Sequence, residues 1–211
     1  MVCINRGRLK GQRVDDRGGV LAEEDSCFAA LRQIRSVRNS IPRQAMLSLV
    51  VSIVMTRLDY GSATLAGLPA HLTDRLQSVM NAATWLIFSS RKYDHVTPLL
   101  HELHWLRMMQ RTEYKLAVLV YRCLHGSAPP YLASDLERVA DLDDRRRLRS
   151  SLTDAINVPS TRLSTVGDCA FPVAAARVWN SLPATVTSSP SLLTFKRRLK
   201  TELFARSYPD C

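Results

Sequence analysis

The amino-acid sequence predicts a mainly α-helical protein. Apolar residues recur at steps of three and four over several stretches, which places them on one face of a helix. Proline, glycine and serine separate these stretches, and such residues commonly mark turns and helix ends. We therefore expect a helical bundle over residues 21–90 and a helical continuation over 91–135. A looser extension over 136–211 is expected to hold a few short extended segments, a basic loop and a terminal amphipathic helix.

The first elements are a leader and a helix. Residues 1–20 contain five basic residues, two acidic residues and four glycines without an apolar period, which predicts a flexible or unrelated leader. Phe28, Leu31, Ile34 and Val37 then follow at three-residue steps and predict an amphipathic helix. This helix has a basic flank made of Arg32, Arg35 and Arg38.

A central helix is expected after Pro42, because proline needs no hydrogen-bond partner in a first helical turn. The residues that follow are apolar on nearly every side: Met46, Leu49, Val50, Ile53, Val54 and Leu58. Their Val and Ile content makes a pair of buried strands the competing prediction. After turn residues at Gly61, Gly67 and Pro69, a further helical stripe comprises Leu72, Leu76, Val79, Met80, Ala83, Leu86 and Ile87.

The middle of the chain predicts two more helices. Thr97 and Pro98 are expected to be the N-cap and a first-turn proline of a short helix that ends near Trp105. A longer helix is expected over residues 108–124, with Gly126 as its C-terminal stop. Its inward residues are predicted to be Met109, Leu116, Val120 and Cys123.

The C-terminal extension is predicted to be less regular. Residues 141–149 form a charge run without apolar spacing, which indicates an exposed loop. Residues 155–159 and 162–166 are short, turn-bounded candidates for extended segments. Residues 171–179 predict a helix that tolerates Pro172 in its first turn.

The last helix is the most distinct element of this extension. Ser189 is expected to cap it and Pro190 to occupy its first position. Its apolar face comprises Leu192, Phe195, Leu199 and Leu203. Beside that face lie Lys196, Arg197 and Lys200, so one side is expected to pack and the other to present cations.

The charge balance favours a polyanionic partner. Lys plus Arg number 29 against 19 for Asp plus Glu, a net charge of +10, and 24 of the basic residues are Arg. Arginine presents a planar fork to phosphate and a flat face to bases. The alternative is an even spread of arginine over the surface. The longest apolar stretch, residues 45–55, is far short of the roughly 20 residues of a membrane span, so no membrane partner is expected.

The cysteines and the N-terminal sequence indicate an intracellular protein, nuclear or cytoplasmic. Five cysteines are dispersed along the chain without a C-x-x-C pair, which fits a reducing compartment. Residues 1–20 contain no apolar core of a secretory signal.

The sequence motifs do not predict an enzyme, a cofactor or a metal site. His101 and His104 flank Glu102 at a spacing one residue shorter than that of the H-E-x-x-H metalloprotease motif. The acidic group of Asp141, Asp143 and Asp144 superficially resembles paired Mg²⁺-binding aspartates, but three arginines follow at once, so a solvated loop is expected. No phosphate-binding glycine loop or nucleophile signature occurs in the sequence.

The basic clusters are the candidate nucleic-acid-binding residues. The first contains Arg91 and Lys92 beside Tyr93, and the second contains Arg107, Arg111 and Lys115 at steps of four. We expect these three to project from one helix face and follow a sugar-phosphate backbone. The alternative is that each cluster is simply the solvent-exposed side of a helix and binds no ligand. The remaining candidates are Arg145, Arg146, Arg147 and Arg149 in the loop, and Lys196, Arg197 and Lys200 in the last helix.

Several segments occur together in an order that resembles a known family, the reverse transcriptases of non-LTR retrotransposons (LINE elements of the jockey and chicken-repeat kind). The similarity is to the region C-terminal to the palm and runs from about Phe28 to Phe204. The segments are LDYGSATLAGLP (58–69), LQSVMNAATWLI (76–87), RKYDHVTPLLHELHWL (91–106), YRCLHGSAPPYL (121–132), LRSS (148–151), VPSTRLSTVGDCAF (158–171), VWNSLP (178–183) and TFKRRLKTELF (194–204).

The resemblance implies a thumb-like region over residues 21–90, which grips template and primer, and an extension behind it. Full relatives are RNA-directed DNA polymerases whose Mg²⁺-binding aspartates lie in a palm that has no counterpart in this sequence. This fragment is therefore expected to be noncatalytic and to bind RNA or an RNA/DNA template-primer, with the palm as a further partner. The alternatives are a helical protein-interaction module and a nonfunctional remnant. Departures from the family pattern, consistent with a remnant, are Gly61, Arg107, Cys169 and Ala176.

Overall fold

The computed structural model describes residues 16–60, 69–141, 155–161 and 167–209. Within these ranges the chain is helical and contains no strand, which confirms the predicted mainly-α fold. Two main apolar cores organise it: the first consists of buried residues between Cys27 and Met108 together with Tyr208, and the second of buried residues between Leu106 and Leu203. No helix in the described ranges is long and apolar enough to cross a membrane.

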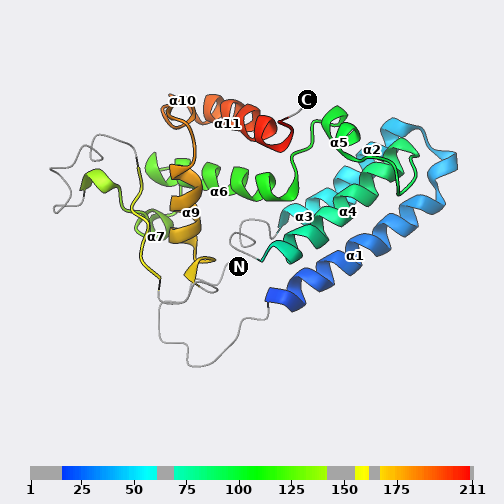
Figure 1. The fold of residues 1–211 in the computed structure, drawn as a ribbon, viewed down its shortest axis with the longest axis horizontal. Helices are drawn as coiled ribbons and strands as arrows, with labels where there is room; N and C mark the ends of the chain where they lie inside the picture. The colour runs from blue at the N-terminus through cyan, green and yellow to red at the C-terminus, as the bar shows by residue number, and fades with distance from the viewer. Residues whose placement is uncertain (1–15, 61–68, 142–154, 162–166, 210–211) are drawn as a thin grey trace.

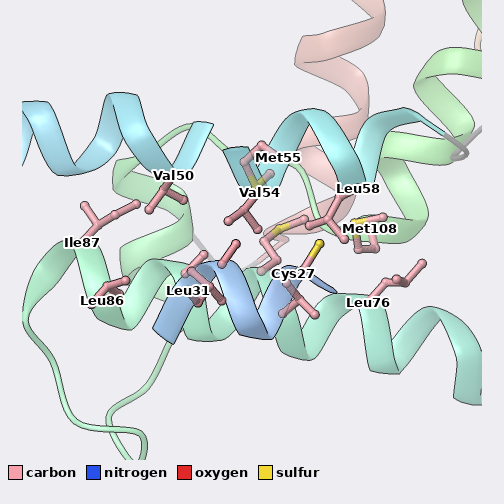
Figure 2. Close-up of a cluster of buried hydrophobic side chains, with 14 of the residues drawn as sticks. Cys27, Leu31, Val50, Val54, Met55, Leu58, Leu76, Leu86, Ile87 and Met108 are labelled. Carbon is pink, nitrogen blue, oxygen red and sulfur yellow. The ribbon is translucent and has the colours of Figure 1, made fainter. Parts of the chain in front are cut away.

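The first core is a bundle of three long helical segments. α1 (Asp16–Ser36) and α4 (Ala70–Phe88) run side by side in the same direction, and the helix between them returns the other way (Figure 1). That helix comprises α2 (Arg43–Val50), the π-helical turn η2 (Val51–Met55) and α3 (Thr56–Tyr60). Its residues are helical throughout, so the competing prediction of two buried strands is wrong. Figure 2 shows apolar side chains of these helices converging in the core.

The helical pattern begins earlier than its apolar period suggests. α1 starts at Asp16, so the last five residues of the predicted leader belong to a helix. A helix extends easily from a turn that tertiary packing already fixes, because each added residue contributes one hydrogen bond at little further entropic cost. The rest of the predicted leader lies outside the described residues. α1 is followed by the 3-10 turn η1 (Arg38–Ser40).

Two further helices, α5 (Thr97–Glu102) and α6 (Met108–Leu124), confirm the predicted helices of the middle region with shifted details. Thr97 is the first helical residue instead of the N-cap, and α5 ends before Trp105. In α6, Met108 is 1% exposed and Met109 is 55% exposed, so the prediction that Met109 points inward is wrong. The buried residues of α6 recur at steps of four, beginning at Met108. The backbone N–H of Met108 donates to the Gln77 side-chain oxygen at 2.8 Å.

The second core lies on α6. The elements after it are α7 (Pro130–Ala133), η3 (Val139–Asp141), α9 (Phe171–Asn180), α10 (Ala184–Thr187) and α11 (Leu192–Ser207). α11 lies along α6 and α9 crosses it (Figure 1). At the centre, the Phe195 ring stacks on Tyr121 at a centroid distance of 4.4 Å and lies 5.8 Å from Trp179.

Residues 155–159 form a single antiparallel bridge, between Ile156 and Arg138, instead of a strand. The backbone of Ile156 is held on its other side by the Asn180 amide, which accepts from its N–H at 2.9 Å and donates to its carbonyl at 2.8 Å. A side-chain amide thus replaces the neighbouring strand that these residues would otherwise need. The other predicted extended segment, 162–166, lies outside the described residues.

The cap of α11 is Ser191, whose hydroxyl oxygen accepts from the Thr194 N–H at 3.3 Å, so the prediction of Ser189 is wrong by two residues. Ser189 is buried, and its carbonyl accepts a 2.9 Å hydrogen bond from the Tyr121 hydroxyl. At the other end, the Tyr208 hydroxyl donates to the Trp105 carbonyl at 2.6 Å. Phe204 contacts both cores, so α11 closes one core and joins it to the other.

The packing of α11 leads to a stability prediction. Leu199 is 0% exposed in the second core, whereas Leu193 on the same helix is 81% exposed. Leu199→Ala is expected to lower the free energy of unfolding by about 2 to 5 kcal/mol, because it removes buried surface and leaves a cavity. Leu193→Ala should change it by less than about 0.5 kcal/mol. Urea denaturation followed by circular dichroism measures both, and equal losses would contradict this packing.

Candidate nucleic-acid interface

The predicted row of three cations on α6 is already engaged by the protein. The Arg111 guanidinium grips the Asp59 carboxylate of α3, with Nη2 at 2.7 Å from Oδ2 and Nε at 3.1 Å from Oδ1. The Lys115 ammonium donates to the Asp59 backbone carbonyl and lies 3.7 Å from Oδ1. Arg107 precedes α6 and lies over the Tyr208 ring, 5.4 Å from its centroid. Two of the three predicted cations, Arg111 and Lys115, are therefore paired with Asp59, and Arg107 is exposed just before the helix.

Asp59, Arg111 and Lys115 form an ion cluster, and its partial burial has an electrostatic cost. Burial lowers the pKa of the Lys115 ammonium, the Asp59 carboxylate raises it, and the nearby Arg111 guanidinium lowers it again. The resulting pKa lies below the ordinary value of 10.5. Asp59 therefore offsets part of the cost of placing two cations between α3 and α6.

A different set of cations lines an open groove between the last turns of α1 and α4. The groove has a volume of about 590 Å³ and an apolar floor that includes Phe28, Leu31 and Trp85. Five cationic side chains surround this floor: Arg32, Arg35, Arg38, Arg91 and Lys92. The structure thus brings together the basic flank of α1 and the Arg91–Lys92 pair, which are more than 50 residues apart in the sequence.

The groove carries a surplus of positive charge. The described residues that line it include no carboxylate, and none of its five cations forms an ion pair within the described ranges. The C-terminal ends of α1 and α4 both lie here, and each contributes a partial charge of about −0.5. Two such dipoles offset roughly one of five positive charges, so helix-end stabilisation alone does not account for the set.

The loop after α4 is held in place beside the groove. The Asp94 carboxylate accepts from the Arg91 backbone N–H at 2.7 Å, and the Asp94 carbonyl accepts from the Trp85 indole at 3.1 Å. Tyr93 is 83% exposed, and the Lys92 ammonium lies 4.9 Å from its ring centroid. An exposed ring next to cations is the kind of surface on which a nucleobase stacks.

The remaining predicted cations lie elsewhere. Lys196, Arg197 and Lys200 are exposed on α11. Arg197 lines a hollow that also contains Glu202, and Lys200 lines one that contains Asp59. The four loop candidates, Arg145, Arg146, Arg147 and Arg149, lie outside the described residues.

The histidine and acidic motifs form no metal site among the described residues. His101 packs against aromatic rings, with centroids 5.0 Å from Phe204 and 5.5 Å from Tyr208. Asp141 is exposed at the end of η3, and the two aspartates that follow it lie outside the described ranges. In this structure His101 contributes to aromatic packing between α5 and the C-terminal end of α11.

The ion cluster leads to a prediction for Asp59→Asn. We expect the pKa of Lys115 to fall further, because the substitution removes the carboxylate that raises it. The chain should lose about 1 to 2 kcal/mol of stability at neutral pH, below the roughly 3 to 5 kcal/mol of a fully buried pair. Because the folded-state pKa of Lys115 lies below its unfolded value, part of this loss should be recovered as the pH rises toward 10.5.

NMR titration of the lysine side chains and urea denaturation measure the two effects. The matched control is Asp168→Asn, which removes a carboxylate from the more exposed pair with Arg177. It should leave the pKa of Lys115 unchanged and cost less than about 1 kcal/mol. An unchanged pKa of Lys115 in Asp59→Asn would contradict the assigned cluster.

No protein-family model, curated protein or solved structure matches this chain. The resemblance to non-LTR reverse transcriptases therefore rests on the sequence segments quoted above.

Proposed function

We propose that this chain is a noncatalytic, nucleic-acid-binding part of a non-LTR retrotransposon reverse transcriptase. It binds RNA, or an RNA/DNA template-primer, in the groove between α1 and α4. The observation that carries the proposal is the set of five cations around an apolar floor, with no carboxylate among the described residues that line it. A ligand of this kind is consistent with an intracellular location, nuclear or cytoplasmic.

The groove suits a phosphate backbone because four of its five cations are arginines. Arg32 and Arg35 are one three-residue step apart on α1, about 4.5 Å along the helix, and Arg38 follows at the start of η1. Each guanidinium can hold one phosphate through two parallel hydrogen bonds. Phosphate contacts of this type supply affinity without reading sequence, so binding should be steeply salt-dependent and weakly sequence-dependent.

The resemblance agrees with this location. Arg91, Lys92 and Tyr93 begin the family-like segment of residues 91–106, and the other residues that line the groove lie within residues 21–90, the region similar to the thumb. Polymerisation and its Mg²⁺ belong to the palm in the family, so the proposal assigns no catalytic step and no cofactor to this chain.

The proposal competes with a helical interaction module whose apolar stripes dock the palm. Those stripes are already covered by one another: Leu76 of α4, Leu58 of α3 and Leu31 of α1 are buried in the first core, and Leu199 of α11 in the second. The same burial argues against a nonfunctional remnant whose apolar stripes are exposed. The groove cations, in contrast, remain on the surface.

The test is fluorescence anisotropy with a labelled single-stranded RNA, titrated over a series of salt concentrations. Arg32→Gln/Arg35→Gln should weaken binding and reduce the slope of log K against log salt by about 1.4, because each lost phosphate contact removes roughly 0.7. The matched control, Arg57→Gln/Arg122→Gln, removes the same charge from exposed residues outside the groove. Equal weakening by both variants, or a slope that neither changes, would overturn the proposal.

A further inference from the structure

A second hollow lies where the two cores meet. It has a volume of about 320 Å³ and is lined by α3, the segment between α5 and α6, α6 itself and α11. Its lining residues share none with the groove between α1 and α4. Any ligand in it would contact helices of both cores at once. The volume lies at the lower end of the range for small-molecule sites.

The charged groups in this hollow do not balance. Arg111, Lys115 and Lys200 provide three positive charges, and Asp59 is the one carboxylate among the described residues that line it. These four side chains together have a net charge of +2. Burial lowers the pKa of the Lys115 ammonium, and an added anion would offset this effect.

Several donors in the hollow are not used by the protein. The Tyr114 hydroxyl is partly buried and makes no hydrogen bond within the described ranges, and Lys200 forms no ion pair or hydrogen bond there. Arg111 directs Nε and Nη2 at Asp59, and Nη1 makes no contact with that carboxylate. Oxygen-rich anions are the ligands that such a set of donors recognises.

We infer that this hollow is a binding site for a phosphate dianion, either free or as the phosphate monoester of a small molecule. Lys200 and Tyr114 supply the new contacts, and Arg111, already oriented by Asp59, supplies a third. The doubly charged ligand matches the surplus of two positive charges. The inference is independent of the proposed RNA binding, because the two sites have no residue in common.

The test uses the full chain and isothermal titration calorimetry at pH 7.5 and constant ionic strength. Inorganic phosphate and adenosine 5′-monophosphate are the two probes, and adenosine is the uncharged comparison. Saturable binding of phosphate is expected, with Lys200→Gln weakening it by about tenfold and Tyr114→Phe by about threefold. A matched charge change on α6, Arg122→Gln, should leave it unchanged.

The two probes distinguish the source of the phosphate group. Tighter binding of adenosine 5′-monophosphate than of inorganic phosphate would assign the site to a monoester, and equal or weaker binding would assign it to free phosphate. The inference is overturned if neither probe saturates, if adenosine binds as well as its monophosphate, or if Arg122→Gln weakens binding as much as Lys200→Gln. Unchanged circular dichroism melts of the ligand-free variants would show that each still folds.

Discussion

The carboxylate of Asp59 fixes the helix on which both cores depend. Through Arg111 and Lys115 it ties α6 to α3, and α6 supplies Met108 to the first core and Val120 to the second. Without that carboxylate, two partly buried cations would face each other without compensation. This ion cluster therefore helps to fix how the two groups of helices join, and it engages one arginine and one lysine that would otherwise be available to a ligand.

The division of the positive charge follows from this arrangement. Arg111 and Lys115 of α6 are paired with Asp59, whereas the cations at the ends of α1 and α4 have no acidic partner in the described ranges and surround an apolar floor. A composition count does not separate paired from unpaired arginines. The net charge of +10 therefore overstates the positive charge that a ligand can contact on α6, and it understates the local concentration of positive charge in the groove. Recognition of a polyanion depends on this local excess, not on the total.

The sequence predicted the helices better than the site. The apolar stripe of α4 and the inner face of α11 were correct, because periodic burial follows directly from helix geometry. The ion pair between Arg111 and Asp59 could not be predicted from the sequence, because the two residues are 52 positions apart and only the tertiary fold brings them together. The basic flank that contains Arg32 could be predicted from the sequence pattern. Its position beside Arg91 could not, because it results from the packing of α1 on α4. Details at helix ends, such as the Ser191 cap, depend on neighbouring turns and were also missed.

We propose that nucleic acid binds at the groove between α1 and α4, where the cations have no acidic partner in the described ranges. Photocross-linking of a single-stranded RNA containing 5-iodouridine, followed by mass spectrometry of the peptides, tests it most directly. We expect adducts on the peptide that contains Tyr93, the exposed ring beside the groove. Adducts confined to peptides of α11, with none at Tyr93, would contradict it.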